Sequence, residues 1–174
     1  GKTTLARDLA AHFSSLGRKA VAVPEALRDW CVAQGRTPRP EEQMAIAEEQ
    51  QQRVDDAART HEVVIADTTA VMVAIYSAML FDDGSLYRFA IEKQRGYDVT
   101  LLTGLDLEWV PDGLQRDGPH VREPVDALVR GMLDSASVPY RVVYGTGNER
   151  LGNALSAIDA SFGPRPQVRD WVWR

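Results

Sequence analysis

The sequence predicts an α/β fold in which a parallel sheet is flanked by helices. Short, continuously apolar segments alternate with longer segments of helical periodicity, which is typical of parallel strands joined by covering helices. The chain has 174 residues, which suits one domain, and no repeat or linker-like segment divides it. We expect the domain to cover residues 1–162 and a tail with prolines and tryptophans to cover residues 163–174.

Four segments have the apolar character of buried strands. They lie at residues 19–24 (KAVAVP), 62–67 (EVVIAD), 98–103 (DVTLLT) and 140–144 (YRVVY). The first is followed at once by Glu25, and the second ends on Asp67. Ligands of open α/β sheets gather at the carboxyl ends of the strands, so both acids are candidates for a functional site.

Helical segments separate these strands. Leu5, Leu9, Phe13 and Leu16 recur at helical spacing, and Gly17 ends the first helix. Further helices are predicted at residues 26–34, 40–60, 70–80, 85–95, 125–135 and 148–162, with a charged, Gly- and Pro-containing loop over 107–123. The helix at 40–60 is polar, with Met44, Ile46 and Val54 as its apolar anchors. Its residues Gln43, Gln50 and Arg53 are weaker candidates to face a substrate.

The chain opens with Gly1-Lys2-Thr3-Thr4, which matches the last part of a phosphate-binding loop. Gly1 allows close approach of the backbone, Lys2 reaches the β- and γ-phosphates, and the Thr3 hydroxyl ligates Mg²⁺. The helix that starts at Lys2 points its amides at the anion, so we expect the segment to bind ATP·Mg²⁺. The alternative is a helix that merely begins with Gly-Lys.

A phosphate-binding loop normally follows a strand, and that strand would occupy the centre of the sheet. A fold without it would leave two neighbouring strands with unpaired edges. We therefore expect that this first strand is missing from the sequence and lies upstream of Gly1.

Asp67 is the candidate metal ligand from a strand end. A carboxylate beside a phosphate loop holds Mg²⁺ directly or through water, which would make Asp67 a catalytic residue. The alternative interpretation is that Asp67 caps the helix that follows.

Glu25 is the candidate acceptor-binding residue. Its carboxylate is placed to accept the proton of an attacking hydroxyl or to bind a sugar hydroxyl. Arg28 lies one turn later on the same helix face and would contact a phosphate or the acceptor. The alternative is a first-turn glutamate that is favoured by the helix dipole and paired with an arginine.

Residues 109–118 form a candidate lid, because phosphoryl transfer needs cations around the γ-phosphate. Arg116 and Arg122 are the residues expected to close over ATP, with Arg116 in a catalytic role. The alternative is a solvated charged loop.

Composition excludes several other classes of protein. The net charge is −5 and no dense basic run is present, which argues against a nucleic-acid surface. The single cysteine, Cys31, excludes an internal disulfide and fits a reducing compartment. No apolar run is long enough to cross a bilayer and no signal peptide is visible. We expect a cytoplasmic protein without nucleic-acid or membrane partners.

Several stretches together resemble the ribosylnicotinamide kinase domain of NadR-like proteins, which are P-loop ATPase/kinases of NAD metabolism. These stretches are GKTTLARDLA, PEALRDW, PEEQMAIAEEQQQRVDDA, VVIADTT, DVTLLTGLDLEWVPDGLQRDG and VPY, and they span most of residues 1–154 in the family's order. The resemblance implies a three-layer P-loop NTPase fold of the nucleoside-kinase type. It also implies ATP-dependent phosphorylation of the 5′-hydroxyl of nicotinamide riboside.

The resemblance carries over to individual positions. On it, Lys2 and Thr3 bind ATP·Mg²⁺, the family's E-x-x-R falls on Glu25 and Arg28, and its D-T falls on Asp67 and Thr68. Its W-V-x-D-G-L falls on Trp109, Val110, Asp112, Gly113 and Leu114. Thr69 stands where a further acid can follow, and Pro24 stands where an aromatic residue can precede the glutamate. Trp30 or Tyr76 would then stack on the nicotinamide ring.

Three functions follow as hypotheses. The first is a small-molecule kinase for a nucleoside such as nicotinamide riboside, and the second is a P-loop kinase for another nucleoside or nucleotide. The third is a regulatory module that binds ATP without chemistry. Turnover of ATP that depends on an acceptor separates the first two from the third.

Overall fold

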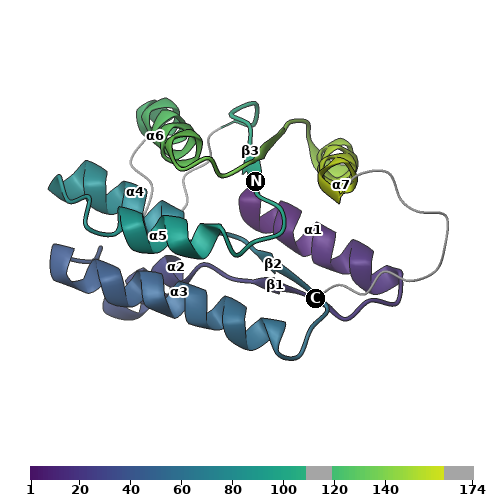
Figure 1. Cartoon of the computed structure of the whole chain (residues 1–174), viewed down its shortest axis with the longest axis horizontal. Helices are drawn as coiled ribbons and strands as arrows, with labels where there is room; N and C mark the ends of the chain where they lie inside the picture. The colour runs from purple at the N-terminus through teal and green to yellow at the C-terminus, as the bar shows by residue number, and fades with distance from the viewer. Residues whose placement is uncertain (109–118, 163–174) are drawn as a thin grey trace.

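The computed structural model describes residues 1–108 and 119–162, so the tail and the segment 109–118 lie outside the described residues. Seven α-helices and four strands alternate within them (Figure 1). In chain order the elements are α1 (Lys2–Ser15), β1 (Ala20–Val23), α2 (Ala26–Gln34), η1 (Pro40–Glu42), α3 (Gln43–Ala58), β2 (Val63–Ala66), α4 (Ala70–Phe81), α5 (Tyr87–Gln94), β3 (Leu101–Thr103), η3 (Pro119–Val121), α6 (Arg122–Ser135), β4 (Arg141–Val143) and α7 (Gly147–Phe162).

The strands pair in parallel, as the sequence predicts. β1 pairs with β2, with Val23 opposite Ala66, and β3 pairs with β4, with Thr103 opposite Val143. The described residues form two separate two-stranded sheets in place of one continuous sheet. All residues of β2 and β3 are half-buried, whereas a strand with neighbours on both edges and helices on both faces is fully buried. The additional strand expected ahead of Gly1 stays a prediction.

Helices cover the β1–β2 pair on both faces. Figure 1 shows α1 on one side of these strands and α3 on the other, and both helices contact both strands. On the far side of the molecule α7 packs against β4 and α1. The strands are thus enclosed by helices in the way that the apolar segments predict.

Two apolar clusters hold the fold together. The larger joins α2 to α6 and includes Ile75 and Leu86, whose side chains are fully buried. The smaller includes Leu5 of α1 and Val143 of β4, with Ile65 of β2 and Leu101 of β3 packed against it. Because the smaller cluster draws on both strand pairs, it fixes their relative position beside α1.

Some helix boundaries and anchors differ from the sequence-based expectation. α2 has the expected bounds, since Gly35 ends it in the left-handed region at φ 65°. α6 begins at Arg122 and not at residue 125, because Pro124 is tolerated in a first helical turn. In α3, Ile46 and Val54 are buried as expected. Met44 is 36% exposed, so its assignment as an anchor was wrong.

No helix among the described residues is long and apolar enough to span a membrane.

An ion pair beside the start of α3, between Arg36 and Glu42, predicts how the stability of the fold depends on pH. Both terminal nitrogens of Arg36 donate to the Glu42 carboxylate, at 2.8 and 2.7 Å, and the Arg39 N–H donates to it at 2.7 Å. The Arg36 hydrogen bonds, followed by the Arg39 N–H, lower the pKa of Glu42 from 4.5 to about 2. The folded state therefore gains stability that is fully present above pH 4.5 and is lost as the pH falls through about 2.

Glu42→Gln should accordingly lower the melting temperature at pH 7, and the deficit relative to wild type should shrink as the pH falls below 4.5. Thermal unfolding followed by circular dichroism from pH 7 to pH 3 measures this. Glu41→Gln, at an exposed neighbouring position, is the control and should show no such trend. A Glu42→Gln deficit of equal size at both ends of the range would contradict the assignment.

Candidate functional site

The first turn of α1 contains backbone amides that have no acceptor within the helix. Leu5 donates the first helical hydrogen bond, to the Gly1 carbonyl at 3.1 Å. The amides of Lys2, Thr3 and Thr4 precede that bond and have no acceptor within the helix. The first turn contains no acidic residue, and Gly1 as the N-cap supplies no side chain. The amides and the positive end of the helix dipole are therefore suited to an anion.

Asp67 lies directly against this helix start. The Thr3 hydroxyl donates to Asp67 Oδ2 at 2.5 Å, although the two residues are 64 positions apart in the chain. The Asp67 N–H donates to the Val23 carbonyl at 3.0 Å, which extends the β1–β2 ladder and fixes the start of the loop. Asp67 Oδ1 is buried and has no hydrogen-bond partner among the described residues. Such an orphaned carboxylate oxygen next to a threonine hydroxyl fits a divalent cation.

The helix after Asp67 is capped by a different residue. Thr69 is the N-cap of α4, and its hydroxyl oxygen accepts the Val71 N–H at 3.3 Å while donating to Gln94 at 2.7 Å. The alternative interpretation of Asp67 as the cap is therefore wrong, and its carboxylate is left for another purpose. The neighbouring Thr68 hydroxyl is also buried without a partner among the described residues.

Glu25 lies at the same sheet edge as Asp67, because Val23 and Ala66 are in register and each acid follows within two residues. Glu25 is the N-cap residue of α2, with a side chain 14% exposed, and its carboxylate lies 3.5 Å from Arg28. The buried Gln50 of α3 binds the backbone on both sides of Glu25. Gln50 accepts the Ala26 N–H at 2.8 Å and donates to the Pro24 carbonyl at 3.4 Å. Gln50 thus holds the turn that presents Glu25.

The other residues considered for the acceptor have packing or polar partners of their own. Trp30 and Tyr76 are half-buried and pack against the larger core cluster. The Arg36 guanidinium lies 4.8 Å from the centre of the Trp30 ring and covers one of its faces. Arg53 pairs with Asp29 and Glu49, which accounts for its charge. Gln43 is buried.

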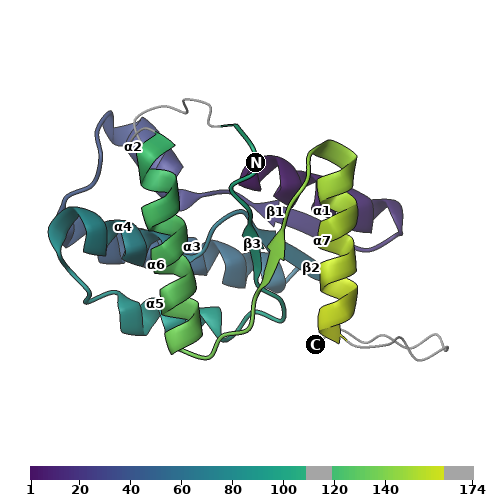
Figure 2. The same cartoon turned by 90° about the horizontal axis from the view of Figure 1, so that it is seen from above.

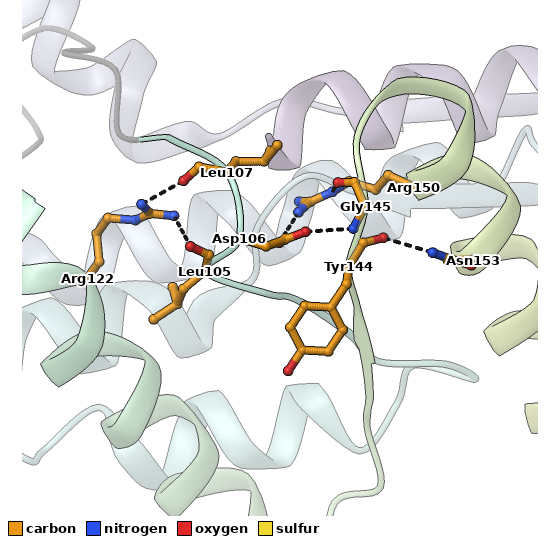
Figure 3. Close-up of polar contacts among 8 residues, drawn as sticks. All are labelled: Leu105, Asp106, Leu107, Arg122, Tyr144, Gly145, Arg150 and Asn153. Carbon is orange, nitrogen blue, oxygen red and sulfur yellow. Dashed lines mark hydrogen bonds and ion pairs between the residues drawn. The ribbon is translucent and has the colours of Figure 1, made fainter.

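The ends of β3 and β4 contribute a cluster that the sequence did not single out (Figure 3). The buried Arg150 of α7 donates to Asp106 Oδ1 at 2.5 Å and to the Gly145 carbonyl at 2.6 Å. Asp106 follows its strand by three residues, so the strand-end criterion that selected Asp67 also applies to it. No sequence signal marks Arg150, since charge alone does not reveal burial.

This cluster adjoins the opening glycine. A β-carbon placed on Gly1 would lie 3.0 Å from Leu107 Cδ1 and 3.4 Å from Arg150 Nη1. Figures 1 and 2 both show the N-terminus beside the end of β3. The start of α1 therefore meets the carboxyl ends of both strand pairs.

Of the two arginines predicted to close over ATP, Arg116 lies outside the described residues. Arg122 begins α6 and donates to the carbonyls of Leu107, at 2.8 Å, and Leu105, at 3.3 Å (Figure 3). It anchors the segment that leads into residues 109–118. Its predicted contact with ATP stays a prediction.

The donor set decides which kind of metal fits. Within residues 1–108 and 119–162 no group of three His, Cys, Asp or Glu side chains gathers as a protein-only metal site. Mg²⁺ usually takes one or two protein oxygens and completes its shell with phosphates and water. Thr3 Oγ1 and the Asp67 carboxylate, beside an anion-binding helix start, supply such a pair.

A comparison with protein families agrees with this geometry. The profile of a family described as "AAA domain" matches residues 1–150. The chain belongs to this AAA-domain family. No match appears among curated proteins. The AAA domain is thus a nucleotide-binding P-loop domain of mixed α/β architecture, and the family match covers α1 and all four strand ends.

The AAA domain brings some of the predicted residues together and leaves others apart. Thr3 and Asp67 touch, and Glu25 pairs with Arg28 at the same sheet edge. Lys2 is half-buried and forms no ion pair with the described residues. Thr4 is exposed on the first turn. The catalytic and binding roles of all these residues stay predictions.

Proposed function

We propose that this AAA domain is an ATP-dependent small-molecule kinase that transfers the γ-phosphate to the 5′-hydroxyl of a ribonucleoside, most specifically nicotinamide riboside. The observation that carries the proposal is the Thr3–Asp67 contact at the start of α1. It unites a hydroxyl, a carboxylate and a row of free helix amides, which are the groups that a magnesium-bound triphosphate requires. The substrate assignment rests on the family stretches given above.

The residues at the start of α1 would hold the nucleotide. The amides from Gly1 to Thr4 would face the phosphates, and the Lys2 ammonium would reach the β- and γ-phosphate oxygens. Thr3 and Asp67 would hold Mg²⁺, which when bound neutralises charge on the phosphates. Arg116 and Arg122 would supply positive charge to the γ-phosphate.

Glu25 would serve the acceptor. Its carboxylate takes the proton of the 5′-hydroxyl while the hydroxyl oxygen forms a bond to the γ-phosphorus. The bond between that phosphorus and the β–γ bridging oxygen breaks, and ADP leaves with the electron pair. Arg28, 3.5 Å from Glu25, orients the carboxylate. Trp30, on the same helix as Arg28, would contact the acceptor.

We also propose that the two strand pairs belong to one sheet of a three-layer, nucleoside-kinase-like domain. Ile65 of β2 and Leu101 of β3 pack against the same apolar cluster under α1, which supports a common layer. We propose that the partner of the site is a small-molecule nucleoside. We also propose that the protein is cytoplasmic and binds neither nucleic acid nor membrane.

A panel of nucleosides incubated with ATP and Mg²⁺ tests the function. Nicotinamide riboside should yield one 5′-monophosphate per ADP formed. The assay uses the full-length protein and measures both products by chromatography. The 5′-deoxy analogue of nicotinamide riboside lacks the attacking oxygen and should yield neither product. Phosphorylation of another nucleoside alone would reject the substrate assignment, and binding of ATP without acceptor-dependent turnover would identify a regulatory module.

A further inference from the structure

Arg150 is a buried charged residue with a closed set of contacts. Its side chain is 5% exposed, and its guanidinium binds Asp106 through Nη2 and the Gly145 carbonyl through Nε (Figure 3). Asp106 Oδ2 in turn accepts the Gly145 N–H at 2.6 Å. The three groups form a ring of hydrogen bonds between the first turn of α7 and the ends of β3 and β4. Removal of the Asp106 carboxylate would leave the buried Arg150 guanidinium without its charged partner.

The position of Gly145 strengthens this ring. Gly145 has φ +97°, which favours glycine, and a β-carbon there would approach the Glu149 side chain to 3.0 Å. Burial alone would raise the pKa of Asp106, but the Gly145 N–H and the Arg150 charge hold it below its ordinary value of 3.8. Asp106 is therefore a carboxylate at neutral pH, and the ring is an ion pair fixed by backbone groups.

The ring faces the phosphate loop. Arg150 Nη1, the nitrogen that binds neither Asp106 nor Gly145, is the one that lies next to Gly1. Leu107 touches the same glycine, and its carbonyl is held by Arg122. A shift of Arg150 would therefore release its contacts with Asp106 and the Gly145 carbonyl, which join the ends of β3 and β4 beside the loop glycine.

We propose that Arg150 is a positioning residue for the nucleotide: it locks the ends of β3 and β4 against Gly1 and so fixes the mouth of α1 for triphosphate binding. This inference rests on the proposed function only in so far as the site binds ATP. A planar guanidinium reaches both acceptors at once, which the single ammonium of lysine does not do in the same geometry.

The test compares Arg150→Lys and Arg150→Gln with wild type in direct titrations with ATP·Mg²⁺, alongside thermal unfolding. Both variants should bind ATP about 10–100-fold more weakly, by analogy with the loss that follows removal of a partner that orients a metal ligand. Arg130→Gln is the matched control. Arg130 pairs with Asp126 within α6 and lies over Tyr140, before the start of β4, so its loss should leave ATP affinity unchanged.

Asp106→Asn is a second variant, in which the new side chain has nearly the size of the old one. It tests the inference even if the Arg150 variants do not fold. It should weaken ATP binding in the same direction, and the double variant Asp106→Asn/Arg150→Gln should bind no more weakly than Arg150→Gln alone, because one ring is lost in both. Folded variants with wild-type ATP affinity, or recovery of affinity by Arg150→Lys, would overturn the inference. Wild-type protein that binds ATP but phosphorylates no nucleoside would overturn the proposed function alone.

Discussion

Replacing Lys2 with alanine is expected to lower kcat for phosphoryl transfer by about 10²–10³-fold, the usual cost of removing one preorganised group that stabilises developing charge. Lys2 is the first residue of α1 and is adjacent to Thr3, whose hydroxyl is bound to Asp67. In the proposed role its ammonium binds the β- and γ-phosphate oxygens. The alanine variant keeps the helix, because alanine is the strongest helix former.

Initial rates at saturating ATP and acceptor measure the effect. The control is Lys93→Ala on α5, which removes a lysine whose ammonium lies 5.6 Å from the centre of the Phe89 ring. Both variants should unfold at nearly the wild-type temperature. A Lys2→Ala enzyme with wild-type kcat would show that the opening Gly-Lys is only a helix start, which is the alternative given by the sequence.

Most of the secondary structure could be predicted from local patterns in the sequence. Gly35 ends α2 where expected because glycine adopts the left-handed conformation at low cost. The apolar segments predicted all four strands, since short, continuously apolar segments are typical of parallel strands covered by helices. Which strand pairs with which was not accessible, because pairing depends on neighbours that are remote in the chain and not on the strand's own residues.

The candidate site was accessible only in part, for a related reason. The rule that acids at strand ends meet at one edge selected Asp67 and Glu25, and Asp67 does lie against Thr3. The same rule passed over Asp106, because the charged loop that follows it obscured the end of β3. Arg150 was not singled out from the sequence, and Gln50 was considered only as a residue that could face a substrate. Their observed roles depend on the fold, since Arg150 binds Asp106, 44 positions away, and Gln50 binds backbone groups 24 and 26 positions away.

Replacing Glu25 with glutamine should lower kcat by about 10²–10⁴-fold, the range for loss of a general base. The amide keeps the size and one oxygen of the carboxylate but cannot take the proton of a hydroxyl. The turn that carries it should persist, since Gln50 binds Ala26 and Pro24 through their backbone groups. ATP affinity should therefore stay near wild type, and the loss should fall on the chemical step.

Glu49→Gln is the matched control, since Glu49 is also ion-paired with an arginine, Arg53, but lies on the exposed face of α3. Steady-state rates with varied nucleoside separate the possible roles of Glu25. A large fall in kcat with little change in KM assigns it to proton transfer, because uniform binding is then intact. A raised KM with unchanged kcat would make it a residue that only binds the acceptor. Wild-type values of both kcat and KM would make Glu25 a structural partner of Arg28. Its carboxylate then only balances the Arg28 charge, 3.5 Å away.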